Sequence, residues 1–229
     1  MALVASYSPE VFSGLLGPRE QHLRQKETMD LSRLRDVFHE YHMEHTCGLA
    51  LLHRHYDVSI DEIVVETINS KRSDSAPVKT ESCPRVVPHL WRYHNGMWYP
   101  TEFLSIEGDH DKLSTAIELS NSVTSKADFL RDAGKVLEEL GLHDLFGLQT
   151  THRDLFLRSD PTDTVLELTD VPTRVSSITA IPQDQPQPEY FIDTFFGFAC
   201  RDPKTCGHAL HGRNACGWTA CAYGCCSDY

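Results

Sequence analysis

Apolar residues recur at helical spacing in two segments of the chain, residues 29–45 and 125–141. In the first segment the apolar stripe begins at Leu31, directly after Asp30, which is expected to cap the helix. In the second segment the stripe begins at Phe129 and recurs every three or four residues. Each pattern predicts an amphipathic helix that covers one face of a core.

Shorter apolar runs bounded by turn residues predict strands in most of the remaining chain. Asn95-Gly96, between two aromatic-rich runs, predicts a hairpin with a type I′ turn. Residues 1–26 are expected to form loop and short turns, and the polar stretch 69–84 a surface loop. The expected strands lie within residues 48–56, 61–68, 85–94, 97–106, 145–153, 163–170, 174–182 and 190–201.

The segment 136–153 repeats residue types of the segment 37–54 at a constant spacing of 99 positions. The identical pairs are Val37/Val136, Glu40/Glu139, Gly48/Gly147, Leu49/Leu148, His53/His152 and Arg54/Arg153. Two interpretations stay open, a chance echo and an internal duplication. A duplication would make two pseudo-symmetric α-β-β-β-β units, 27–105 and 125–199, and would relate the two His-Arg pairs by a pseudo-twofold axis.

The predicted fold class is α+β, with one or more antiparallel sheets and packed helices. We expect residues 1–26 to be an N-terminal extension, residues 27–199 a single α+β domain, and residues 200–229 a Cys/His-rich C-terminal tail.

The net charge of the chain argues against two classes of binding partner. The 229 residues carry a net charge of −12 with histidine neutral, which argues against broad binding to nucleic acid or to an anionic membrane. The chain has neither the pattern of a signal peptide nor an apolar run of the ~18 residues that a membrane span requires. We therefore expect a cytoplasmic protein.

The run His53-Arg54-His55 follows a clean apolar strand pattern. If the strand continues through it, both imidazoles face one side and Arg54 faces the other. Two imidazoles on one face suit a metal ion or acid-base chemistry near neutral pH, and an arginine suits a carboxylate or a phosphate. Nearby acids such as Asp57, Glu66 or Glu167 are candidates to orient an imidazole. The alternative is a core polar network in which these groups satisfy one another.

Three further residues join this candidate catalytic set. His152 and Arg153 repeat the His-Arg pair in the second half of the chain, and His45 continues the apolar stripe of the first predicted helix, so it is expected to point inward. His89 and His94 lie on the aromatic hairpin, and we do not predict them as ligands.

The tail holds six of the eight cysteines, together with two histidines. Thiolate and imidazole ligands suit zinc or another transition metal, and the bound ion would stabilise a Gly-rich segment that has no hydrophobic core of its own. A tail with free thiols is the alternative, and in an oxidising compartment disulfides would be the better interpretation. The candidate metal ligands are Cys206, His208, His211, Cys216 and Cys221.

Several common motifs are absent from the sequence. It has no phosphate-binding Gly loop, no dinucleotide fingerprint, no GxSxG and no HExxH, so no nucleotide cofactor is expected.

The stretches GLALLHRHYDV, DEIVVE and WYPTEF resemble uncharacterised fungal proteins that carry an LLHRHF-type strand. The resemblance covers roughly residues 40–105, and Tyr56 stands where that motif has phenylalanine. It implies a soluble, intracellular fungal protein. It implies no particular activity and transfers no catalytic residue.

Two functions follow as hypotheses. The first is an enzyme acting on an anionic or polar small molecule, with His53, Arg54 and His55 lining a polar pocket, helped by His152, Arg153 and His45. An imidazole would act as general base or metal ligand. The second is a non-catalytic, metal-stabilised binding protein that uses the aromatic hairpin and the tail as contact surfaces.

Overall fold

The computed structural model describes residues 3–25, 31–107, 110–160, 163–182, 184–185, 191–199 and 219–222. Within these ranges eleven strands form one sheet in the order β10-β1-β6-β4-β5-β2-β3-β8-β7-β11-β9. The strands are β1 (Cys47–Leu51), β2 (Glu62–Asn69), β3 (Arg72–Lys79), β4 (Val86–His94), β5 (Met97–Ser105), β6 (Phe146–Thr150), β7 (Thr164–Asp170), β8 (Val175–Ile181), β9 (Phe191–Asp193), β10 (Phe195–Phe196) and β11 (Thr219–Ala222).

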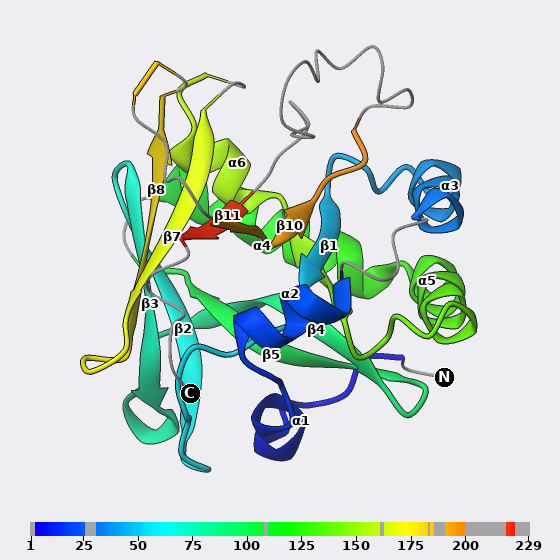
Figure 1. Ribbon diagram of the computed structural model, residues 1–229, viewed down its shortest axis with the longest axis horizontal. Coiled ribbons are helices and arrows are strands. Elements are labelled where there is room, and N and C mark those ends of the chain that lie inside the picture. The colour runs from blue at the N-terminus through cyan, green and yellow to red at the C-terminus, as the bar shows by residue number, and fades with distance from the viewer. Residues whose placement is uncertain are drawn as a thin grey trace.

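The sheet is strongly curled (Figure 1). β9 and β10 stand at opposite ends of the strand order, yet only Thr194 separates them in the chain, so the two ends of the sheet meet. Most neighbouring strands are antiparallel, while β2 with β5 and β11 with β7 are parallel. The prediction of an α+β fold with an antiparallel-rich sheet is therefore confirmed.

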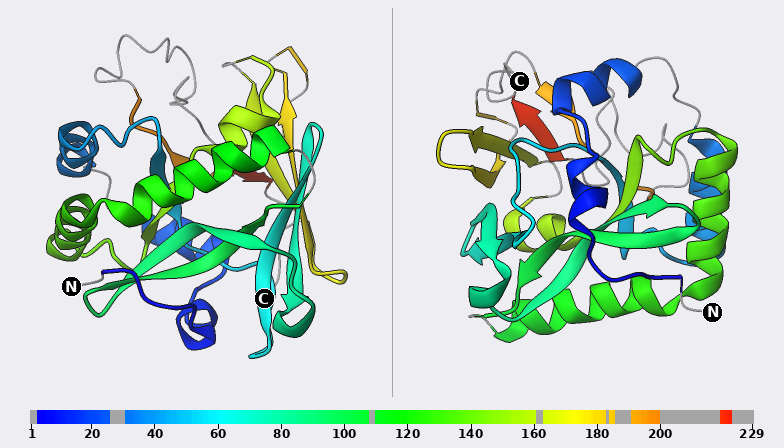
Figure 2. Two further views of the ribbon diagram at one scale, coloured as in Figure 1. Left: turned by 180° about the vertical axis from the view of Figure 1, so that it is seen from behind. Right: turned by 90° about the horizontal axis from the view of Figure 1, so that it is seen from below.

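Six α-helices surround the curled sheet in the described residues: α1 (Pro9–Ser13), α2 (Pro18–Gln25), α3 (Ser32–Glu40), α4 (His110–Ser125), α5 (Ala127–Glu139) and α6 (His152–Leu157). In Figure 2, α3 and α5 lie side by side at one edge, and the long α4 runs across the back of the sheet. The largest apolar cluster lies between these helices and the outer face of β1 and β6. Its members include Phe38, Phe129, Leu49, Leu148 and Trp98.

The two segments that echo each other in sequence have matching local geometry. The helices end 99 positions apart, at Glu40 and Glu139, and each is followed by a six-residue turn before its strand. The second residue of each turn, His42 or Gly141, has a positive φ of 55° or 68°. β1 and β6 then pair antiparallel, with Leu49 opposite Leu148. Beyond the strands the two halves differ, because β1 leads into a loop and β6 leads into α6.

The aromatic hairpin is confirmed, with φ of 49° at Asn95 and 79° at Gly96, as a type I′ turn requires. The predicted loop 69–84 is wrong over most of its length, because β3 occupies residues 72–79 and pairs with both β2 and β8. Its polar residues Ser73 and Ser75 are buried, and Ser73 donates a hydrogen bond to Glu66. The polar strand β3 is stable because Glu66 accepts a hydrogen bond from its buried Ser73 hydroxyl.

Two local predictions need correction near the first His-Arg pair. The strand ends at Leu51, so His53, Arg54 and His55 lie in the loop that follows and not on a strand. The first predicted helix ends at Glu40 rather than continuing to residue 45, because the chain turns at His42. His45 therefore lies in the turn and is exposed, so the prediction that it points inward is wrong.

Of the predicted tail, the structure describes the backbone of β11, which pairs with β7 and β9. The candidate ligands Cys206, His208, His211 and Cys216 lie outside the described residues. Cys221 belongs to β11, and its side chain is likewise outside the description.

Candidate metal centre

A buried cluster of charged and imidazole side chains lies where α6 packs against β7 and the neighbouring strands. Four strands, one helix and the loop after β1 contribute to it. Its acids are Glu66 on β2, Glu102 on β5 and Glu167 on β7. Its nitrogen-bearing groups are His53 and His55 in the loop, His89 on β4, and His152 and Arg153 on α6.

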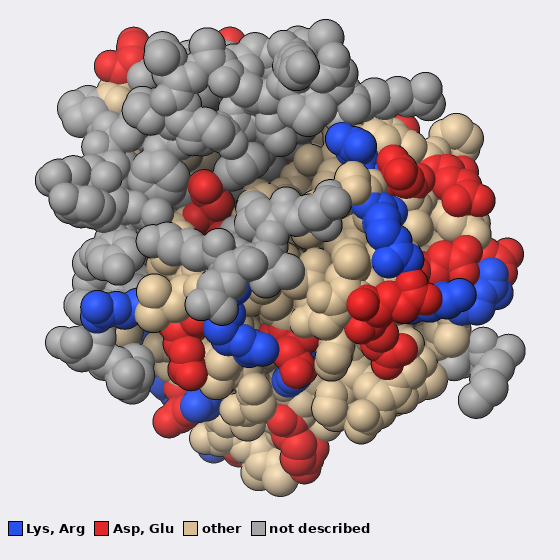
Figure 3. All heavy atoms as spheres, turned by 45° about the vertical axis from the view of Figure 1, so that its right-hand side comes forward, with Lys and Arg blue, Asp and Glu red and all other residues tan. Residues whose placement is uncertain are grey.

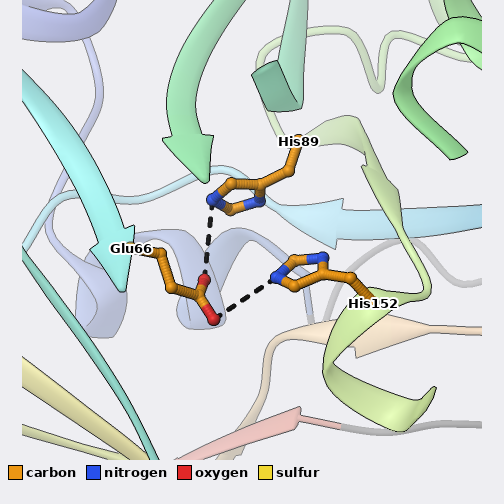
Figure 4. Close-up of side chains that lie close together, drawn as sticks. All are labelled: Glu66, His89 and His152. Carbon is orange, nitrogen blue, oxygen red and sulfur yellow. Dashed lines mark ion pairs between the residues drawn. The ribbon is translucent and has the colours of Figure 1, made fainter. Parts of the chain in front are cut away.

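Glu66, His89 and His152 converge at the centre of this cluster (Figure 4). One ligand atom from each residue lies within 4.8 Å of the other two. His152 Nε2 is 3.3 Å from Glu66 Oε1, and His89 Nε2 is 3.5 Å from Glu66 Oε2. All three side chains are buried, with relative exposures of 0 to 1%. Two imidazoles and a carboxylate are a donor set that zinc and other transition metals accept, so this group could hold a metal ion.

The two imidazoles of this group have unused hydrogen-bonding atoms. Both nitrogens of His89 and Nε2 of His152 have no hydrogen-bond partner among the described residues. A buried imidazole nitrogen is rarely left without a partner, because losing its hydrogen bond to water has a cost in free energy. His152 Nδ1 lies 2.7 Å from Thr150 Oγ1, and this contact turns Nε2 toward Glu66.

Arg153 is the buried cation that accompanies this group. Its Nε and Nη2 donate to Glu66 Oε2 at 3.0 and 2.8 Å, and its Nη1 donates to Glu167 Oε2 at 3.4 Å. Burial alone would raise the pKa of Glu66, but Arg153 and then His152 outweigh it and hold that pKa well below its ordinary value. Glu66 is therefore a carboxylate, the form that a metal ion requires.

A second set of contacts runs from Glu167 toward the half-buried His53. His55 Nε2 lies 3.1 Å from Glu167 Oε1 and 3.1 Å from His53 Nε2. His53 Nδ1 donates to the Leu51 carbonyl at 2.7 Å. Burial, and next the neighbouring His55, lower the pKa of His53 to about 4. His53 is thus neutral at pH 7, and its Nε2 is the acceptor in the pair.

The cluster has three carboxyl groups and one guanidinium, that of Arg153. Burial raises the pKa of Glu102 to about 7, and Glu167 and Glu66 add to that effect while Arg153 opposes it. The pKa of Glu167 falls to about 2, because the hydrogen bond from His55 and the charge of Arg153 outweigh its burial. Burial, and next His152, lower the pKa of His89 well below its ordinary value, so that ring is neutral. One guanidinium thus faces two carboxylates and a third carboxyl group that ionises near neutrality.

Of the residues predicted from sequence, the structure brings His53, His55, His152 and Arg153 into this cluster. It places two elsewhere: Arg54 pairs with Asp57 at the surface, and His45 is exposed. Of the three acids expected to orient an imidazole, Glu66 contacts His152 and Glu167 contacts His55. His89 was set aside as a ligand and is part of the central group. Nothing in its local sequence distinguishes it, because its neighbours in the cluster come from β2 and α6.

A surface pocket lies between the loop after β1 and the turn that joins β7 to β8. Tyr56 lines this pocket and also feels the charges of the buried cluster. Burial, then Glu102 and Glu167, raise the pKa of its hydroxyl. That hydroxyl donates to the Ser75 carbonyl at 3.4 Å. The pocket is lined by Tyr56, Asp57, Val58, Ser59, Val171, Pro172 and Arg174.

No family model, curated protein or solved structure matches this chain. The fold and the cluster must therefore be interpreted from their own chemistry.

On the side that carries α3 and α5, acidic and basic side chains of the described residues are interspersed (Figure 3). Arg33 pairs with Glu139, and Arg131 pairs with Asp128 and Asp132. Among the described residues, no helix combines the length and the apolar character that crossing a membrane demands.

Proposed function

We propose that this protein is a metal-assisted enzyme acting on a polar or anionic small molecule, with Glu66, His89 and His152 holding a divalent transition metal ion such as zinc. The observation that carries the proposal is the convergence on one buried carboxylate of two buried imidazoles whose Nε2 atoms make no hydrogen bond within the described part of the chain. Three protein ligands leave further coordination positions for water or substrate, which is the arrangement of catalytic rather than structural zinc.

Charge balance supports the metal. Glu66 and Glu167 are carboxylates, and Arg153 is the single guanidinium that faces both of them. A buried cluster with surplus negative charge gains stability from a bound cation.

The ion pairs of the two arginines indicate how an anionic substrate would bind. Arg153 is already paired with two carboxylates, and Arg54 pairs with Asp57. An anionic group of the substrate would therefore bind to the metal ion rather than to either arginine.

Acid-base groups stand beside the proposed ion. His89 Nε2 lies 3.8 Å from Glu102 Oε2, and the Glu102 side chain keeps 18% of its exposure. On the other side, Glu167 connects Arg153 with His55 and His53. A metal ion lowers the pKa of a bound water, and a neighbouring carboxylate or imidazole can then accept its proton.

The pairings of the strands support a duplicated origin for this centre, which we include in the proposal. A pseudo-twofold axis through the Leu49–Leu148 pair would relate His53 to His152. It would also exchange the hairpins β2-β3 and β7-β8, which pair through β3 and β8. His53 and His152 would then both reach a shared interior, while the first half alone would supply Glu66 and His89 to the metal centre. We keep the cytoplasmic location expected from sequence in the proposal.

The alternative is a non-catalytic binding protein stabilised by a metal in the tail. One observation argues against a tail that forms a separate contact module. β11 lies in the sheet between β7 and β9, so part of the predicted tail belongs to the folded body. A tail acting as a separate contact module would leave the sheet complete without it.

The test measures zinc by elemental mass spectrometry and calorimetry in wild type, His89→Gln, His152→Gln and the control His94→Gln. We expect one ion per chain in wild type and in the control. His89→Gln, His152→Gln and the double variant should each lose more affinity than the about 10- to 100-fold that removal of an outer-shell partner causes. The loaded protein is then assayed with p-nitrophenyl acetate and p-nitrophenyl phosphate. Absence of stoichiometric metal, or metal retained when both histidines are replaced, would overturn the proposal.

A further inference from the structure

Arg153 and Ser73 occupy most of the acceptor positions of Glu66. A carboxylate has about four lone-pair positions, two on each oxygen. Arg153 donates twice to Oε2, from Nε at 3.0 Å and Nη2 at 2.8 Å. Ser73 Oγ donates to Oε1 at 2.7 Å. One position on Oε1 is left for a further partner.

The remaining position is on the oxygen nearer to His152. Oε1 lies 3.3 Å from His152 Nε2, whereas the oxygen that Arg153 holds lies 3.5 Å from His89 Nε2. An ion between the three side chains would thus receive two nitrogen ligands and a single oxygen from Glu66. Bidentate binding by Glu66 would require Arg153 to leave.

Arg153 is held in this orientation from its far side. Nη1 donates to Glu167 Oε2 at 3.4 Å, and Glu167 itself contacts His55 at 3.1 Å. The guanidinium is planar and spans both carboxylates, so it fixes the plane of the Glu66 carboxylate. Both partners and the arginine are buried, with exposures of 0 to 7%.

We propose that Arg153 determines which metal this centre accepts, by restricting Glu66 to one coordinating oxygen. A nitrogen-rich site with few ligands suits zinc and cobalt. Magnesium and calcium require six or more ligands, mostly oxygen, which this set does not supply. The inference rests on the proposed function, because it requires that Glu66, His89 and His152 bind an ion.

The test uses cobalt(II) as the probe, because its visible absorption is intense in four-coordinate sites and weak in six-coordinate ones. We expect the intense spectrum in wild type and in the control Arg54→Lys, whose arginine pairs with Asp57 at the surface. In Arg153→Lys the positive charge remains, but the planar pair of donors is lost. Its spectrum should weaken, and its preference for zinc over manganese, measured by calorimetry, should fall by about tenfold.

The outcomes separate this inference from the proposed function. If wild type binds cobalt through His89 and His152 but shows the weak six-coordinate spectrum, the role of Arg153 is wrong while the metal centre stands. The wild-type spectrum can therefore overturn the inference even if Arg153→Lys does not fold. An unchanged spectrum and unchanged selectivity in a folded Arg153→Lys would also overturn the inference. A wild type that binds neither cobalt nor zinc overturns both proposals.

Discussion

The two His-Arg pairs of this chain follow similar sequence segments, but one arginine lies at the surface and the other is buried. Each follows a helix, a turn and a five-residue strand of matching geometry. After β1 the chain runs into a loop, and Arg54 turns outward to Asp57. After β6 the chain enters α6, and Arg153 is buried between Glu66 and Glu167. The comparison teaches that the backbone after the strand, rather than the dipeptide, decides whether an arginine becomes part of the buried cluster.

The largest expected difference between the two halves is in stability. Arg153→Met leaves Glu66 and Glu167 buried without their cation, and breaking such a pair costs about 3–5 kcal/mol. Arg54→Met removes a surface pair and should change the free energy of unfolding by less than about 1 kcal/mol. Urea denaturation of both variants measures the difference. Equal effects of the two substitutions would mean that Arg153 is not the buried counter-ion of this cluster.

A smaller difference is expected at Gly48 of β1 and Gly147 of β6, which lie 99 positions apart in the chain. A Cβ on Gly147 would lie 2.3 Å from the Trp91 carbonyl oxygen, so the neighbouring strand β4 would have to move. A Cβ on Gly48 would meet the Phe196 carbonyl oxygen at 2.6 Å and the Phe195 ring at 2.7 Å. Both alanine variants should be destabilised by about 1–3 kcal/mol, with Gly147→Ala the worse. The melting temperatures of the two variants measure which is less stable. A Gly147→Ala variant as stable as wild type would contradict the close approach of β4 to β6.

His53 should make stability depend on pH. Its pKa is about 4 in the folded protein and 6.5 ordinarily, so between these values the unfolded chain binds a proton that the folded chain does not. This contribution to stability is present above pH 6.5 and is lost as pH falls toward 4, at up to ~1.4 kcal/mol per pH unit. His53→Gln should reduce the slope to the part that His89 and the other groups contribute, and His94→Gln should leave the slope unchanged. Urea titrations at several pH values measure it; identical slopes in wild type and His53→Gln would refute the assignment.

The smallest effect is expected at the turns that precede the two strands. Gly141 has a φ of 68°, which glycine adopts freely, whereas His42 has a φ of 55° at the equivalent position. His42→Gly should therefore be stabilised by up to ~1 kcal/mol, and Gly141→Ala destabilised by a similar amount. Melting temperatures of the two variants should move in opposite directions. A destabilised His42→Gly would show that the histidine side chain contributes more than its backbone strain costs.

Much of the fold could be predicted because its signals are local. The amphipathic stripe of α5 and the Asn95-Gly96 turn depend on residues that are close in sequence. The strand β3 could not be predicted, because Ser73 looks like a loop residue until Glu66 is known to lie beside it. α6 was missed for a related reason: His152 and Arg153 are stable on a buried helix only with acids supplied by β2 and β7.

Sequence alone was enough to predict the two covering helices and the aromatic hairpin, and to identify two His-Arg pairs 99 positions apart. Helix stripes and turn residues are properties of neighbouring positions. Which members of the two pairs enter the buried cluster depends on long-range packing, as does the presence of His89, which no local pattern marked. Desolvation explains this: a guanidinium is stable in the interior only with carboxylate partners, and a buried imidazole needs a hydrogen-bonding group or an ion beside it. Here those carboxylates come from strands far away in the chain.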